Sequence, residues 1–112
     1  MSNNKDLNFY YKFVLKTFGH ADLLGCRALA NLLYLYKPGD MIADICETYA
    51  NSISSTSTAV ARCVNRYIKE FMKEITMEEL STMLDYSFKA NQTTVSASEL
   101  IPVLKLALES EE

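Results

Sequence analysis

Turn-forming residues are scarce in this chain, which has only three Gly and two Pro among its 112 residues. A β-sandwich or barrel needs many tight turns, and Gly and Pro commonly supply them. The scarcity therefore favours helices. Hydrophobic residues make up 49% of the chain and charged residues 22%, which is typical of a folded globular domain. The sequence predicts an all-α fold in a single domain that covers residues 1–112.

Apolar residues recur at helical spacing in six segments. Gly19 follows the first segment, as a C-cap glycine does, and residues 37–40 form a turn after the second. Thr76 and Ser96 each stand three residues before a Glu, which matches the capping box that begins a helix. We therefore expect six helices, covering approximately residues 5–18, 22–36, 41–52, 56–75, 76–84 and 96–109. The second segment is apolar on nearly every side, which predicts the central buried helix.

The fourth segment divides into two opposite faces. One face is apolar and consists of Val60, Val64, Tyr67, Ile68, Phe71 and Ile75. The opposite face carries four cations, Arg62, Arg66, Lys69 and Lys73. Hydroxyl side chains precede and open the segment at Ser55, Thr56, Ser57 and Thr58. A helix start of this kind offers backbone N–H groups and a positive dipole end to a phosphate.

Positive charge is concentrated in this segment, although the whole chain carries a net charge of −3. Residues 55–73 sum to +3, which leaves −6 for the rest. A shorter helix precedes the basic one, and we expect the turn between them to bury small Ala50 and apolar Ile53. This arrangement predicts a helix-turn-helix, in which the second helix enters the major groove of DNA by its N-terminal residues. The alternative is an ordinary solvated helix face, which the acidic remainder of the chain favours.

Other chemistry is weakly represented. His20 has no Cys or carboxylate at metal-ligand spacing, and the sequence contains no catalytic motif, so we expect neither an enzyme nor a metal or other cofactor. Cys26, Cys46 and Cys63 are odd in number and lie in apolar contexts, which predicts buried, reduced thiols. The polar N-terminus resembles no signal peptide, and no apolar run is long enough to span a membrane. We therefore expect a cytoplasmic protein with no membrane partner and no small-molecule substrate.

The chain, and its fourth segment in particular, resembles the DNA-binding effector domain of the stage zero sporulation protein A family. Members of this family are transcription regulators of endospore-forming bacteria. The resemblance runs from about Phe9 to Leu108. It is densest over residues 49–62 (YANSISSTSTAVAR), which align without a gap with the family's helix-turn-helix, and it returns at residues 83–88 (MLDYSF) and 96–101 (SASELI). The resemblance implies a six-helix fold, major-groove reading by the fourth helix, and binding as head-to-tail pairs on tandem sites.

The sequence departs from the family pattern at several positions of the fourth helix. Ala59 and Ala61 stand where the family has arginine and glutamate, whereas Arg62 matches a family arginine. Asn65 replaces another arginine and Arg66 replaces a histidine. The region between Leu33 and Met41 is shortened, and no segment resembles the family's phosphoacceptor domain, so we expect no phosphorylation-controlled dimerisation.

The sequence therefore predicts a sequence-specific DNA-binding transcription regulator, associated with the nucleoid, whose partner is the major groove of double-stranded DNA. In this interpretation the helix N-terminus holds phosphates together with Ser55, Thr56, Ser57 and Thr58, and Ala59 also belongs to the DNA-binding surface. Arg62, Asn65 and Arg66 face the bases, where Arg suits guanine and Asn suits adenine. Lys69 and Lys73, with Lys89 from the polar connection at residues 85–95, would follow the backbone. The alternative is a helical protein-interaction module on the same fold that has lost specific DNA binding through Ala59 and Ala61.

Overall fold

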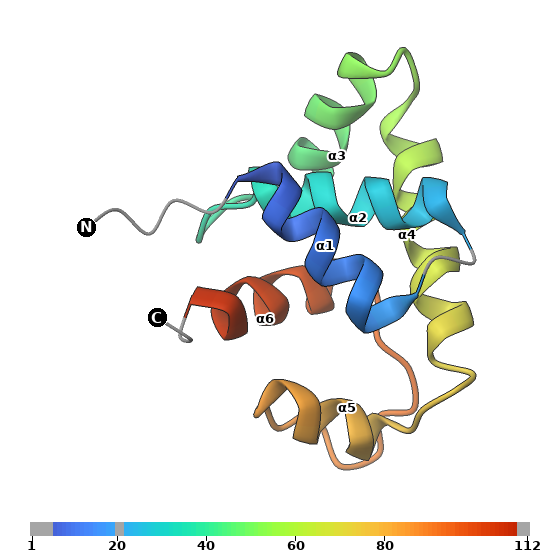
Figure 1. Ribbon diagram of the computed structural model, residues 1–112, viewed down its shortest axis with the longest axis vertical. Coiled ribbons are helices and arrows are strands. Elements are labelled where there is room, and N and C mark those ends of the chain that lie inside the picture. The colour runs from blue at the N-terminus through green and yellow to red at the C-terminus, as the bar shows by residue number, and fades with distance from the viewer. Residues whose placement is uncertain (1–5, 20–21, 110–112) are drawn as a thin grey trace.

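The computed structural model describes residues 6–19 and 22–109, and this part of the chain contains helices and their connections but no strand. The prediction of an all-α fold with six helices is confirmed (Figure 1). The helices are α1 (Leu7–Phe18), α2 (Leu23–Leu35), α3 (Ile42–Ser52), α4 (Ser57–Phe71), α5 (Met77–Leu84) and α6 (Ala97–Glu109).

Side chains of the sequence fix where several helices begin. Asp6, Asp22 and Thr56 precede α1, α2 and α4, and each accepts a hydrogen bond from a backbone N–H in the first turn. Thr76 forms the predicted capping box with Glu79, with hydrogen bonds of 3.0 and 2.8 Å in the two directions. These caps supply acceptors for N–H groups that have no partner inside their own helix.

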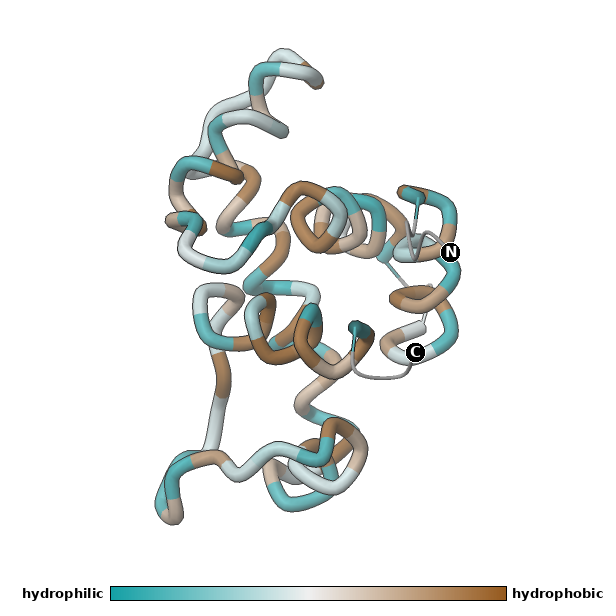
Figure 2. Tube along the Cα trace, turned by 90° about the vertical axis from the view of Figure 1, so that its left-hand side faces the viewer, coloured by the Kyte–Doolittle hydropathy of each residue, from teal (hydrophilic) through white to brown (hydrophobic). Residues whose placement is uncertain are grey.

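The central position of α2 is also confirmed, because α1, α3, α4 and α6 all pack against it. Its side chains Leu29, Leu32 and Leu33 are fully buried. Figure 2 shows hydrophobic residues where the helices face one another. The helix is nevertheless open to solvent at its start, where Leu23 and Leu24 are exposed. None of the described helices combines the length and apolar character needed to cross a membrane.

The fourth helix is shorter than the sequence predicts, because α4 ends at Phe71 and not at Ile75. Residues 72–75 form a tight turn, in which the N–H groups of Lys73 and Glu74 donate to carbonyls three residues earlier. The turn is needed because Thr76 must adopt an extended backbone to cap α5, and a continuous helix would prevent this. Phe71 and Ile75 are still half-buried against the core.

Helices α3 and α4 are joined by a short turn, residues 53–56, that forms the apex of the molecule in Figures 1 and 2. From this apex α4 runs along one edge of the fold, beside α2. The opposite end of the molecule is formed by α5, which packs against α6. The N-terminal end of α4 therefore lies at a protruding corner.

Candidate nucleic-acid interface

The inner face of α4 is buried as the sequence predicts. Val60, Val64, Tyr67 and Ile68 are each exposed by no more than 4%. Tyr67 makes the closest approach to α2, because its Cβ and ring lie directly over Gly25, where no side chain intervenes. Its hydroxyl donates a 2.5 Å hydrogen bond to the carbonyl of Gly19. Packing and this hydrogen bond therefore fix the rotation of α4 about its own axis.

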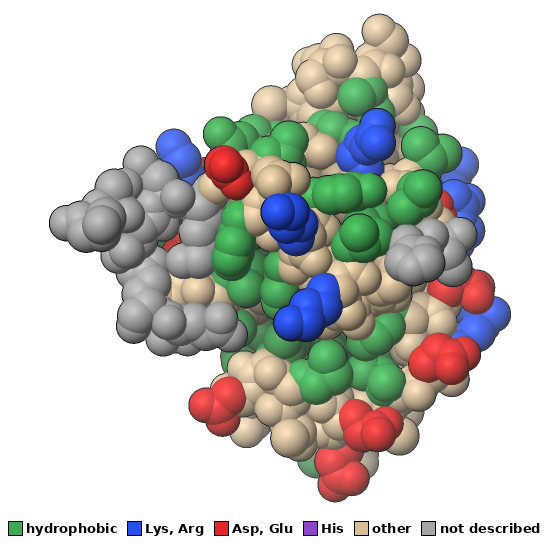
Figure 3. Space-filling model, in the orientation of Figure 1, with side chains coloured by type: hydrophobic (Ala, Val, Ile, Leu, Met, Phe, Trp, Pro, Cys, Tyr) green, Lys and Arg blue, Asp and Glu red, His purple; other side chains and the backbone are tan. Residues whose placement is uncertain are grey.

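With its inner face fixed, α4 turns its predicted cationic face outward. A shallow hollow of about 590 Å³ follows this face. Its lining consists of Thr58, Ala61, Arg62, Asn65, Arg66 and Lys69. In the view of Figure 3, Lys and Arg side chains gather along the right-hand edge over α4, with acidic side chains beside them. Five of the six lining residues are ones that the sequence places at DNA, and Ala61, whose small side chain leaves the hollow open, is the addition.

The four cations of α4 and the turn after it differ in whether an acidic neighbour faces them. Lys73 lies beyond the end of α4, and its Nζ pairs with the Glu70 carboxylate at 3.0 Å. Arg66 makes a longer contact of 3.9 Å with Asp22. Across residues 6–19 and 22–109, no carboxylate lies within 4.0 Å of the cationic nitrogens of Arg62 or Lys69. These two side chains thus present their full charge to solvent.

The turn at the apex combines hydroxyl side chains with an unusual backbone. Ser54 has a positive φ of 57°, and the N–H of Ser55 donates to the Ala50 carbonyl at 2.8 Å. Thr56 uses its Oγ1 to accept from the Ala59 N–H at 3.1 Å. Thr56, Thr58 and Ala59 are exposed, and Ser55 and Ser57 are half-buried.

The expectation that Ala50 and Ile53 are both buried in this turn is correct for only one of them. Ala50 is 1% exposed, whereas Ile53 is 50% exposed. The reason is local, because the chain turns at Ser54 immediately after Ile53 and leaves the isoleucine outside the contact between α3 and α4. The apex therefore presents an apolar side chain beside its hydroxyl groups.

Two residues predicted to meet DNA have other surroundings. The Oδ1 of Asn65 accepts a hydrogen bond from the backbone N–H of Ala97, the first residue of α6, at 2.8 Å. Lys89 lines a separate hollow with Gln92 and Glu99, in the connection between α5 and α6. Local sequence patterns reveal neither arrangement. Asn65 and Ala97 are 32 residues apart, and Lys89 lies in an irregular connection whose fold brings it near Glu99 of α6.

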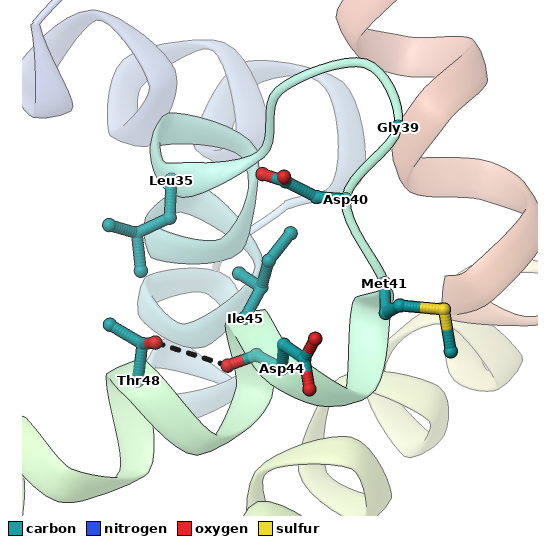
Figure 4. Close-up of a pocket in the computed structure, with 7 residues that line it drawn as sticks. All are labelled: Leu35, Gly39, Asp40, Met41, Asp44, Ile45 and Thr48. Atoms are coloured by element: carbon teal, nitrogen blue, oxygen red, sulfur yellow. Dashed lines mark hydrogen bonds between the residues drawn. The ribbon is translucent and has the colours of Figure 1, made fainter.

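A hollow between α2 and α3 is less suited to a nucleic acid. It has a volume of about 370 Å³ and lies between the end of α2 and the start of α3, and its lining includes Asp40 and Asp44 (Figure 4). Leu35, Met41 and Ile45 supply its apolar lining, and the Thr48 hydroxyl donates to the Asp44 carbonyl at 3.1 Å. Two carboxylates at its rim would repel a phosphate.

The cysteines show no feature of a reactive centre. Cys26 and Cys46 are buried and Cys63 is half-buried, so the prediction of burial holds fully for the first two only. Burial raises the pKa of all three thiols, which disfavours the thiolate. In the described part of the chain no three His, Cys, Asp or Glu side chains are grouped as metal ligands, and His20 lies outside that part.

Comparisons with known proteins add no relative: the chain matches no family model, no curated protein and no solved structure. The resemblance to the sporulation regulators therefore depends on the quoted residues alone.

Proposed function

We propose that this chain binds double-stranded DNA through a helix-turn-helix formed by α3 and α4, and acts as a sequence-specific transcription regulator of the sporulation type that it resembles. The single observation that carries the proposal is the outward face of α4, where Arg62 and Lys69 have no acidic neighbour among the described residues. Counterion release makes such cations the main source of affinity for DNA.

The dimensions of α4 support this proposal. With 15 residues the helix is roughly 22 Å long, and with its side chains about 10–12 Å wide, which fits a major groove about 12 Å across. Its N-terminus lies at a protruding corner, so a duplex could approach it without meeting the rest of the fold. The exposed Thr58 and the backbone N–H groups of the first turn would face phosphates.

Because the resembled family binds as head-to-tail pairs, we also propose that two copies of this chain bind tandem DNA sites. The second candidate function is a helical protein-interaction module on the same fold that has lost specific DNA binding, and the net charge of the chain favours it. The −6 carried outside residues 55–73 repels a duplex, and Ala59 offers no polar group at the start of the helix where base contacts are made.

The experiment is a binding titration against a pool of randomised duplexes at low salt, followed by selection of the preferred sequence. Arg62→Ala should cost about 1–3 kcal/mol on that sequence and relax the preference at one position. Lys69→Ala should weaken binding to all sequences alike and lower the salt slope by about one unit.

The matched control is Lys37→Ala, which removes the same charge from the exposed turn between α2 and α3, on the opposite edge of the molecule from α4. If DNA binding uses α4, this variant keeps the wild-type base preferences and salt slope. A folded wild-type protein with no affinity for any duplex at low ionic strength would rule out the regulator and leave the interaction module.

A further inference from the structure

Asn65 lies in the middle of the outward face of α4, between Arg62 and Lys69 in the lining of the hollow. Its Oδ1 accepts a 2.8 Å hydrogen bond from the backbone N–H of Ala97. Ala97 is the first residue of α6, where N–H groups have no partner within their own helix. A side chain of α4 therefore caps a helix that begins 32 residues later.

The segment leading into α6 is fixed by further hydrogen bonds. The Gln92 side chain donates from Nε2 to the Glu99 carboxylate at 2.7 Å and to the Thr94 carbonyl at 2.9 Å. Its Oε1 accepts from the Lys89 N–H at 3.2 Å. The sequence predicts that the Glu99 side chain bonds to the backbone of Ser96 in a capping box, whereas the structure shows it accepting from the Gln92 side chain. These bonds tie the connection to α6, and Asn65 ties the start of α6 to α4.

Burial makes the cap from Asn65 hard to replace. Ala97, which carries the bonded N–H, is only 3% exposed and Val95 is 6% exposed, whereas Ser96 between them is exposed. The hydrogen bond from this N–H to Asn65 is partly buried, so water reaches the N–H less freely than at an open helix start. An unpaired N–H there would be destabilising.

The cap also restricts what Asn65 can do with a base. An asparagine recognises adenine through both ends of its amide, with Oδ1 accepting from N6 and Nδ2 donating to N7. Here Oδ1 already accepts from the Ala97 N–H, so an adenine contact of this kind would have to share that oxygen with the N–H, or turn the amide and leave the N–H without a partner. The loss of the cap would offset the gain at the base.

We infer that Asn65 is a positioning residue that holds α6 and its preceding connection against α4, and that it does not read adenine. The claim that Asn65 does not read adenine rests on the proposed function, whereas the claim that it positions α6 does not. The base preferences of the interface are then set by the neighbouring arginines, while Asn65 fixes the surface from which they project.

The test uses three variants of the full chain. Asn65→Ala removes the acceptor, Asn65→Asp keeps an oxygen acceptor and adds a negative charge that suits a helix N-terminus, and Asn91→Ala removes an exposed asparagine amide from the connection. The readouts are hydrogen exchange at the Ala97 amide, thermal unfolding, and base preferences by sequence selection. Exchange at Ala97 reports the cap directly.

For Asn65→Ala we expect several-fold faster exchange at Ala97, a lower Tm, and base preferences retained at every position with uniformly weaker binding. Asn65→Asp should restore the wild-type exchange and Tm, and Asn91→Ala should change none of the three readouts. The inference is overturned if Asn65→Ala leaves exchange and Tm unchanged, or if it abolishes a preference for adenine at one position. If the wild type binds no DNA, the proposed function fails, and exchange and unfolding still decide whether Asn65 positions α6.

Discussion

Replacing Gly25 with Ala tests how closely α2 and α4 must approach for α4 to hold its orientation. A Cβ at this position would lie 2.6 Å from the Cβ and 2.8 Å from the Cγ of Tyr67. Ordinary carbon–carbon contacts are about 3.5–4.0 Å, so the added methyl group is about 1 Å too close. Rotation of the tyrosine cannot relieve the contact, because its Cβ is fixed by the backbone of α4.

Two opposing effects determine how much Gly25→Ala changes the free energy of unfolding. Ala is a better helix former than Gly by up to about 1 kcal/mol, which favours the variant. An extra methyl group in a well-packed contact costs about 1–3 kcal/mol. Tyr67 can yield little, because its hydroxyl is bonded to the Gly19 carbonyl and its ring packs against Phe18 with the centroids 6.1 Å apart. We therefore expect Gly25→Ala to lower the free energy of unfolding by about 1–2 kcal/mol.

Urea unfolding followed by far-ultraviolet circular dichroism measures this difference. Asn31→Ala is the matched control, since it also places Ala in α2 but at a position whose side chain bonds only to the Arg27 carbonyl in its own helix. Its stability should stay within about 0.5 kcal/mol of the wild type. A Gly25→Ala protein as stable as the wild type would refute the close approach of α2 and α4, and with it our account of how α4 is oriented.

Three further predictions concern stability and thiol chemistry. Lys105→Met removes the buried ammonium that donates to the Leu33 carbonyl at 2.6 Å and should cost about 1–3 kcal/mol in urea unfolding. Burial lowers the pKa of Lys105 in the folded protein, so just below the ordinary lysine pKa the unfolded chain binds more protons than the folded chain. The free energy of unfolding of the wild type should therefore rise with pH in that range, and Lys105→Met should lack this rise. Thr76→Ala breaks the capping box of α5 and should cost about 1 kcal/mol in thermal unfolding; an unchanged Tm would show that the box contributes nothing. Cys46, at 2% exposure and with its pKa raised by burial, should react with a thiol reagent only after unfolding, whereas half-buried Cys63 should react first in the folded protein.

The sequence predicts the fold well where local chemistry decides it. The Thr76 capping box begins a helix as expected, and Gly19, with φ of 91°, ends one. Helical periodicity alone sets the buried face of α4, because one side of a helix must face the core. These features depend on residues within a turn or two of one another, so they can be recognised without knowing the rest of the fold.

Features that depend on distant partners could not be predicted in this way. The apolar character of Ile53 says nothing about which side of the turn it faces, and the structure exposes half of it. The close approach at Gly25 depends on where Tyr67 falls when α4 crosses α2. The resemblance predicts that Asn65 faces DNA, but its hydrogen-bond partner Ala97 is 32 residues away in the sequence and local spacing does not reveal it.

The contrast between local spacing and tertiary contacts also shows which cations of α4 are most available to a phosphate. Spacing predicts a row of four cations, and tertiary contacts then divide it, because Asp22 lies near Arg66 and Glu70 pairs with Lys73. The Lys73–Glu70 pair is on exposed side chains, where ion pairs contribute about 0–1 kcal/mol, so a phosphate can displace Glu70 at modest cost. Asp22 is half-buried and also accepts from the Gly25 N–H, so it stays beside Arg66 and weakens the attraction of Arg66 for a phosphate. Among the described residues, Arg62 and Lys69 have no carboxylate partner that a phosphate would need to displace. The strongest attraction for an anion is therefore expected along the line joining these two side chains, in the hollow that begins at Thr58 near the start of the helix.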